Sequence, residues 1–220
     1  MDGGMIAKSK FATFLDIFAA SPICAVVTLP DAALAVPVAQ ALARAGVKTL
    51  EITLRTEAGI PAIRKIAREV PEILVGAGTV LKPGDMHSAI DAGARFIISP
   101  GATEALLAAG RASPVPYLPG VGTASELMVA LDYGYDCFKI FPIIPMGGVQ
   151  LARILGGPFP KQKFCANGGV ALESSAELLK EPNIVGVGAV WLTPPDALRD
   201  RDFARIEAIA CTAVEKLRTS

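Results

Sequence analysis

A single lysine interrupts the apolar segment Cys137–Phe141, which Pro142 ends. A short apolar run rich in branched and aromatic residues is typical of a buried strand. A buried ammonium is costly unless it has a charged partner or loses its proton. A desolvated, neutral lysine can attack a carbonyl carbon and form a Schiff base. Lys139 is therefore a candidate nucleophile; the alternative is a structural lysine whose stem is buried while its ammonium reaches water.

A second apolar segment, Val47–Thr53, contains Glu51 and is followed by Arg55. A carboxylate near an amine can carry protons through the carbinolamine and enamine steps of Schiff-base chemistry, and a guanidinium can hold a substrate carboxylate through two hydrogen bonds. The alternatives are a buried salt bridge of Glu51 with Lys139 or Arg55, and an Arg55 that is only a surface charge. The three side chains together indicate amine catalysis on a carboxylate substrate.

Strand-like and helix-like segments alternate along the chain and must position these residues. The predicted strands are continuous apolar runs: Ile23–Thr28, Val47–Thr53, Ile73–Gly78, Arg95–Ser99, Val115–Leu118, Cys137–Phe141, Lys163–Ala166 and Ile184–Gly188. The predicted helices follow a short N-terminal helix at Phe11–Ala20: Asp31–Ala45, Ile60–Val70, Pro83–Ala92, Thr103–Arg111, Ala124–Asp132, Val149–Leu155, Leu172–Leu179 and Phe203–Leu217. Asp31 and Thr103 are predicted N-caps, and Gly46, Gly93 and Gly134 are predicted helix ends.

Eight such units with short loops predict an α/β fold, a (β/α)8 TIM barrel with a short N-terminal helix, as a single domain over residues 1–220. An open doubly wound sheet is the main alternative. Its dinucleotide fingerprint needs a third glycine that Gly76-Ala77-Gly78-Thr79 lacks. The sequence therefore favours the barrel, whose active sites lie at the carboxyl ends of the strands.

Small residues follow several predicted strands at this end. Thr79 lies beside a close approach of the backbone, and it could at the same time cap the next helix. Gly168 and Gly169 precede a helix, where exposed N–H groups and the positive end of the helix dipole favour a phosphate. Gly188 and Ala189 end the eighth strand, and the loops after the seventh and eighth strands of barrels often bind phosphate. The sequence predicts a phosphate site there.

Composition narrows the class of protein. The 220 residues are 52% hydrophobic and 19% charged with a formal net charge of zero, which favours neither a nucleic-acid partner nor a membrane surface. Residues 1–10 lack the apolar core of a signal peptide, and four dispersed cysteines indicate reduced thiols, so a cytoplasmic protein is expected. The lone histidine, His87, argues against a Ser-His-Asp triad and a multi-histidine metal site.

These segments resemble the family of 2-keto-3-deoxy-6-phosphogluconate (KDPG) and 4-hydroxy-2-oxoglutarate aldolases, the class I (Schiff-base) pyruvate aldolases. The resemblance extends from about Ile23 to Leu198. It is carried by Glu51-Ile-Thr-Leu-Arg55-Thr, Val75-Gly-Ala-Gly-Thr79-Val-Leu, Ile98-Ser-Pro-Gly101, Leu118-Pro-Gly120, Asp132-Tyr-Gly134, Phe138-Lys139-Ile-Phe-Pro142, Gly147-Gly148 and Gly168-Gly169.

The resemblance implies that Lys139 forms the Schiff base with pyruvate and that Glu51 is the general acid and base. The pyruvate carboxylate, the pocket wall and the sugar phosphate would be contacted by Arg55 and Thr79, by Pro100, and by Gly168 and Gly169, respectively. It further implies a (β/α)8 barrel, a homotrimer, and no metal or organic cofactor. The expected reaction is cleavage of KDPG to pyruvate and glyceraldehyde 3-phosphate.

Two positions depart from the family pattern. Asn167 stands where the family commonly has threonine, and Val190 stands where it commonly has serine. Because both changes fall at the distal, phosphate-binding end, the same chemistry on another 2-oxo acid stays open: the phosphogalactonate epimer, 4-hydroxy-2-oxoglutarate or a non-phosphorylated sugar acid. A non-catalytic barrel that binds a phosphorylated metabolite and a phosphate-binding isomerase are the alternatives from other classes, and neither explains Lys139.

Overall fold

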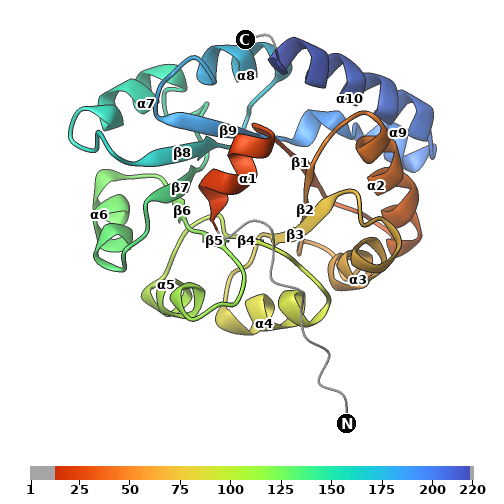
Figure 1. Ribbon diagram of the computed structural model, residues 1–220, viewed down its shortest axis with the longest axis horizontal. Coiled ribbons are helices and arrows are strands. Elements are labelled where there is room, and N and C mark those ends of the chain that lie inside the picture. Colours follow the sequence, from red (N-terminus) through yellow and green to blue (C-terminus); the bar gives the residue numbers. More distant parts are fainter. Residues whose placement is uncertain (1–12, 219–220) are drawn as a thin grey trace.

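Parallel strands form a barrel with helices around its outside in the computed structural model, which describes residues 13–218 (Figure 1). The strands are β1 Ile23–Val27, β2 Thr49–Thr53, β3 Leu74–Gly78, β4 Ile97–Ile98, β5 Tyr117–Leu118, β6 Gly120–Val121, β7 Cys137–Ile140, β8 Lys163–Ala166 and β9 Ile184–Ala189. Their order in the sheet is β5-β4-β3-β2-β1-β9-β8-β7-β6. The predicted barrel is confirmed, and the open doubly wound sheet is wrong.

The barrel closes at Pro119. β5 and β6 lie at opposite ends of the sheet order, yet only this proline separates them in the chain. β5 pairs with β4, β6 pairs with β7, and the Pro119 carbonyl accepts a hydrogen bond from the Lys139 N–H at 2.9 Å. Proline has no N–H to donate to a ladder. The predicted strand Val115–Leu118 is therefore the first half of an interrupted strand, and with its halves counted as one the barrel has the eight predicted strands.

The helices lie outside the barrel, except that α1 lies across its centre in this view (Figure 1). They are α1 Phe14–Ala20, α2 Ala35–Arg44, α3 Gly59–Glu69, α4 Pro83–Asp91, α5 Glu104–Arg111, α6 Ala124–Asp132, α7 Val149–Gly156, α8 Leu172–Leu178, α9 Pro195–Arg199 and α10 Phe203–Arg218. Short 3-10 turns occur at Ala32–Leu34 and Val190–Leu192. Sequence patterns did not predict α9, because its proline-rich start looks like a loop.

The predicted helix boundaries are largely confirmed. The Asp31 side chain accepts from the Ala33 N–H at 2.8 Å and Thr103 accepts from the Leu106 N–H at 3.3 Å, although Asp31 begins a 3-10 turn before α2. The predicted helix-ending glycines all have positive φ: Gly46, Gly93 and Gly134. At the N-terminus, Phe11 and Ala12 of the predicted helix lie outside the described residues, as do residues 1–10, where the lack of a signal peptide was predicted.

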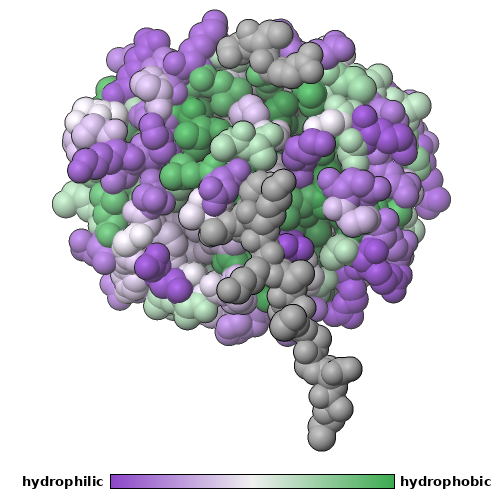
Figure 2. Space-filling view, viewed as in Figure 1, coloured by the Kyte–Doolittle hydropathy of each residue, from purple (hydrophilic) through white to green (hydrophobic). Residues whose placement is uncertain are grey.

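The inside of the barrel is filled at its N-terminal end. α1 inserts Phe14 and Phe18 beneath the strands, where they pack with Phe96. Two strand glycines make room for these rings, because a Cβ on Gly76 would lie 2.3 Å from Phe96 and one on Gly186 would lie 2.3 Å from Phe18. On this face several hydrophobic residues are visible inside a mostly hydrophilic rim (Figure 2). α1 thus acts as a plug that closes one end of the barrel.

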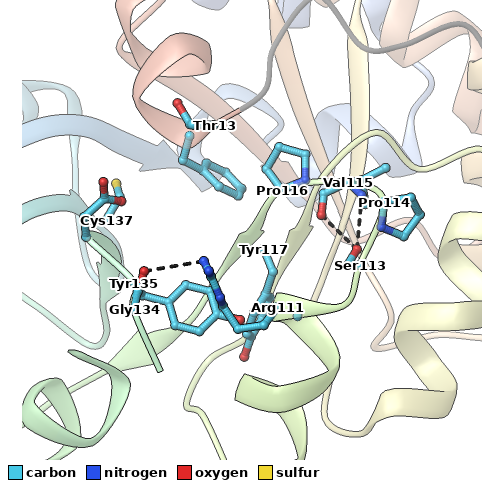
Figure 3. A pocket seen from close by; sticks show the side chains of 13 residues that line it. Thr13, Arg111, Ser113, Pro114, Val115, Pro116, Tyr117, Gly134, Tyr135 and Cys137 are labelled. Carbon is cyan, nitrogen blue, oxygen red and sulfur yellow. Dashed lines mark hydrogen bonds between the residues drawn. The ribbon is translucent and has the colours of Figure 1, made fainter. Parts of the chain in front are cut away.

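A pocket of about 450 Å³ lies beside this plug (Figure 3). Its polar side chains bond mainly to nearby protein groups: Arg111 Nη1 donates to the Gly134 carbonyl at 3.5 Å, and Ser113 Oγ donates to the Val115 carbonyl at 2.8 Å. The Arg111 guanidinium also lies 5.8 Å from the centre of the Tyr135 ring. The pocket is at the opposite end of the barrel from the predicted catalytic side chains.

Candidate active site

Lys139 on β7 and Glu51 on β2 meet inside the barrel. The two strands are four places apart in the sheet order, so the side chains reach each other across the barrel. Lys139 Nζ lies 3.4 Å from Glu51 Oε1, and the two side chains are only 6% and 1% exposed. The alternative in which the Lys139 ammonium reaches water is therefore wrong. The predicted salt bridge is present, and it is the same contact through which a proton would move.

The space for Glu51 comes from a neighbouring strand. A Cβ on Gly78 of β3 would lie 1.8 Å from Glu51 Oε1, so any side chain there would displace the carboxylate. Among residues 13–218, the second oxygen, Oε2, is buried without a hydrogen-bond partner. A buried, unpaired carboxylate oxygen is costly. The barrel thus holds one acceptor in reserve next to the lysine.

Two further groups surround the Lys139 side chain. The Phe141 ring lies with its centre 5.5 Å from Nζ, within the range of a cation–π contact. Cys165 is the partner of Lys139 in the β7–β8 register. Burial raises the pKa values of the Cys24 and Cys165 thiols well above the usual range, so both stay protonated. Protonated thiols are poor nucleophiles, so neither cysteine competes with Lys139 as the candidate nucleophile.

Arg55 and Thr79 lie together at the mouth. Arg55 Nε donates to Thr79 Oγ1 at 3.1 Å. Thr79 has φ +58°, a backbone conformation that residues other than glycine rarely adopt. The alternative that Thr79 caps the next helix is wrong, because the N-cap of α4 is Lys82, which makes no side-chain cap bond. Arg55 is exposed, as predicted for a surface charge, yet no carboxylate of the described residues lies within 4.0 Å of it.

The loop after β8 contains the predicted phosphate-binding residues. Gly168 and Gly169 have φ values of +92° and +76°, and their N–H groups donate to no described residue. Two residues, Val170 and Ala171, separate them from α8, so the two glycines lie just before this helix, as predicted. Because these N–H groups have no acceptor among the described residues, they can bind an anion.

Asn167 and Gly188 are in direct contact. A Cβ on Gly188 would lie 1.8 Å from Asn167 Oδ1, and Asn167 Nδ2 donates to the carbonyl and the thiol sulfur of Cys165 at 3.3 and 3.2 Å. The Ala189 side chain is fully buried in the core between barrel and helices, so only its backbone can face a ligand. Val190 is 52% exposed beyond the end of β9.

Pro100 follows β4 at the same end, and its carbonyl lies 2.4 Å from where a Cβ on Gly120 would be. Gly120 is in turn the register partner of Lys139. Pro100 therefore lies against the strand next to the lysine strand, with the β5–β6 strand between the two residues, as expected of a residue that lines the pocket.

Sequence patterns missed a group of threonines near Arg55: Thr28, Thr53 and Thr56. Thr53 lies two residues after Glu51, so it faces the same side of β2, one step nearer the mouth. That spacing could have identified Thr53, whereas its contact with Thr28 depends on the pairing of β1 with β2 and could not be read from the chain.

Metal and membrane features are lacking in the part of the chain that the structure describes. Within residues 13–218, no group of three or more histidine, cysteine, aspartate or glutamate side chains is placed to hold a metal ion. His87 is exposed on α4. Every helix in this range is too short or too polar to cross a bilayer.

Comparisons with known proteins agree with this geometry. Residues 15–209 match the family model described as KDPG and KHG aldolase. The chain is 46% identical over 198 residues to a 2-dehydro-3-deoxy-phosphogluconate aldolase from Dickeya dadantii, with 90% of this chain and 93% of that protein covered. It is 44% identical over 199 residues to a KHG/KDPG aldolase from Escherichia coli strain K12, again with 90% and 93% covered.

A solved structure adds the fold. The crystal structure of KDPG aldolase from Legionella pneumophila, with pyruvate captured at low pH as a covalent carbinolamine intermediate, has a TM-score of 0.88 and 40% sequence identity to this chain. The match covers 91% of this chain and 97% of the Legionella chain. Sequence, fold and family model all agree, and the chain therefore belongs to the KDPG and KHG aldolase family.

Proposed function

We propose that this aldolase cleaves KDPG to pyruvate and glyceraldehyde 3-phosphate through a Schiff base on Lys139. The observation that carries the proposal is the buried contact of 3.4 Å between Lys139 Nζ and Glu51 Oε1 inside the barrel. A proton that passes from Nζ to the carboxylate neutralises two buried charges at once and frees the amine for attack.

Cleavage then proceeds through an iminium and an enamine. The Lys139 amine adds to C2 of the 2-oxo acid, and Glu51 protonates the departing hydroxyl so that water leaves and an iminium forms. The C4 hydroxyl gives its proton to the Glu51 carboxylate while the C3–C4 bond breaks, and its electron pair moves into the iminium to give an enamine. Glyceraldehyde 3-phosphate leaves. Protonation at C3 and hydrolysis release pyruvate and restore the lysine.

Glu51 is suited to both directions of proton transfer. Its Oε1 faces the amine, while its buried Oε2 has no partner among residues 13–218 and can accept a proton from a bound hydroxyl or water. Arg55 and Thr79 would hold the pyruvate carboxylate, since the guanidinium has no carboxylate partner in the described chain. Pro100 would line the same pocket. These assignments orient C2 toward Lys139.

The phosphate would bind to the free N–H groups of Gly168 and Gly169, with Gly188 and Ala189 completing the wall through their backbones. The observation that favours a changed substrate is at this end. Asn167 is held against Cys165 and Gly188, and Val190 offers no hydrogen bond. Loss of one hydrogen bond to a charged group costs about 1.5–3 kcal/mol. A different 2-oxo acid is therefore the second candidate substrate.

The test is pyruvate release from a panel of 2-oxo acids with and without the 6-phosphate, for wild type and Lys139→Ala. We expect KDPG to be cleaved fastest and the variant to be inactive. If another 2-oxo acid is preferred, the second candidate holds. If wild type releases no pyruvate from any of them, or if borohydride with pyruvate does not modify Lys139, the aldolase proposal is wrong.

We further propose a cytoplasmic homotrimer that needs no metal or organic cofactor. The family resemblance supports the trimer, and the four cysteines, all free thiols, support a reducing compartment. Light scattering in solution should give three times the chain mass of 22.8 kDa. Activity should be unchanged after dialysis against a chelator; a loss that added metal restores would refute the metal-independent chemistry.

A further inference from the structure

Arg55 lies between two threonines that both bond to the end of β1. Thr53 Oγ1 lies 2.8 Å from Thr28 Oγ1, and Thr56 Oγ1 donates to the Leu29 carbonyl at 2.6 Å. Thr53 is completely buried, whereas Thr28 is at the exposed rim of the mouth. The residues before and after Arg55 are thus both fixed to the same neighbouring strand.

The same segment is also fixed to β3 on its other side. The Leu54 N–H donates to the Gly78 carbonyl at 2.8 Å, and Arg55 Nε donates to Thr79 Oγ1 at 3.1 Å. Residues 53–56 therefore form a bridge between the ends of β1 and β3. A turn bonded on both sides cannot shift without losing several hydrogen bonds.

This bridge determines what Arg55 can offer. Its Nε is used by Thr79, which leaves the two terminal nitrogens for a planar carboxylate. A free arginine side chain loses conformational freedom when it binds, and a side chain that is already ordered loses less. Arg55 is exposed and lacks a carboxylate partner among residues 13–218, so the groups available to hold its side chain in place are Thr79 and the bridge to which Arg55 belongs.

We propose that Thr53 and Thr56 are positioning residues that orient Arg55 for the carboxylate of the substrate, with Thr28 as the partner of Thr53. The inference rests on the proposed function, because it takes the Arg55 ligand to be the carboxylate of a 2-oxo acid. It extends that function to two hydroxyl groups whose hydrogen bonds in the described chain go to Thr28 and Leu29, and not to Lys139 or Glu51.

The test compares Thr53→Val and Thr56→Val, which remove the hydroxyls and keep a branched side chain, with Thr53→Ser and Thr56→Ser, which keep them. Thr212→Val is the matched control, because Thr212 donates to the Ala208 carbonyl at 3.0 Å on the outer helix α10. The readouts are kcat and KM for KDPG cleavage, and the pyruvate concentration that half-saturates borohydride trapping.

We expect each valine variant to raise KM and the half-saturating pyruvate concentration about five- to tenfold, as for the loss of one hydrogen bond, with kcat within about twofold of wild type. The serine variants and Thr212→Val should behave like wild type. In an Arg55→Ala background the valine substitutions should have no further effect, because two residues that act through one group are not additive.

Two results would overturn the inference separately from the proposed function. Suppose that borohydride traps pyruvate on the wild type. If Thr56→Val then has the wild-type KM, or if it weakens pyruvate binding by the same factor in the Arg55→Ala background, the bridge does not act through Arg55. If borohydride traps no pyruvate on the wild type, the proposed function fails and the inference fails with it. Should Thr53→Val not fold, Thr56→Val and the serine variants still decide the question.

Discussion

The two ends of the barrel differ in the kind of side chain that they bury. At the N-terminal end, Phe14, Phe18 and Phe96 fill the interior, and the buried Cys137 belongs to the same apolar cluster. At the C-terminal end a lysine and a glutamate are buried, and one carboxylate oxygen has no partner among the described residues. One end is packed for stability, whereas the other keeps costly groups available.

Glycines serve both ends with the same device. Gly76 and Gly186 leave room for phenyl rings at the plugged end, and Gly78 and Gly188 leave room for Glu51 and Asn167 at the mouth. On each of two strands, one glycine thus makes space for an apolar side chain and the next inward-facing glycine makes space for a polar one. The difference between the ends lies in what the neighbouring strands place there, and substitutions should separate stability from activity.

The largest effect should come from Glu51→Gln. The amide keeps the shape of the side chain but cannot exchange protons, so we expect kcat to fall by about 10²–10⁴-fold, the usual contribution of a general acid or base. Steady-state kinetics measures this, with circular dichroism to confirm folding. A variant that keeps more than a tenth of wild-type kcat would show that Glu51 only neutralises Lys139.

At the other end, Phe18→Ala should lower the free energy of unfolding by about 3–5 kcal/mol, because it leaves a cavity under the strands. Activity at low temperature should stay within about twofold of wild type. Denaturant unfolding gives the first quantity, and Met128→Ala, at a side chain that is 58% exposed, is the control. A large loss of kcat in the folded Phe18 variant would mean that the plug and the mouth are coupled.

Gly78→Ala should reduce activity next. The added Cβ would lie 1.8 Å from Glu51 Oε1 and must displace the carboxylate, and a displacement of about 1 Å can lower the rate by about 10²-fold. Gly101→Ala is the matched control at the same end, since its Cβ would meet no atom of residues 13–218 within 4 Å. Equal rates in the two variants would contradict the close approach.

How far sequence could anticipate these two ends depends on the range of the interaction. Lys139 and Glu51 were identifiable because a charge in an apolar strand is a local feature of the chain. The space that Gly78 provides for Glu51, and the contact of Thr28 with Thr53, depend on which strands are neighbours and in what register. Such pairings are set by packing of the whole barrel, so no local pattern contains them.

The same distinction explains the errors in the fold. Helix caps and helix-ending glycines such as Asp31 and Gly46 were predicted because capping involves residues only a few positions apart in the chain. The division of the fifth strand at Pro119 was not, since it arises where the barrel closes and each half pairs with a different neighbour. The 3-10 turn Val190–Leu192 and α9 were missed because elements of three and five residues carry little periodicity.

The smallest effect should appear at high pH, where two buried groups of the plugged end contribute to it. Burial, and secondarily Asp136, raises the pKa of Cys137 from 9.0 to about 12, and burial raises the pKa of Tyr117 from 10.0 to about 12. Between these values the folded chain keeps protons that the unfolded chain releases, so the free energy of unfolding should fall as pH rises from about 9 toward 12. Cys137→Ala should make that decline shallower, whereas Cys211→Ala, at an exposed thiol on α10, should leave it unchanged. Urea titrations at several pH values measure the slope. Identical slopes in wild type and Cys137→Ala would show that the Cys137 thiol does not contribute to the alkaline sensitivity of folding.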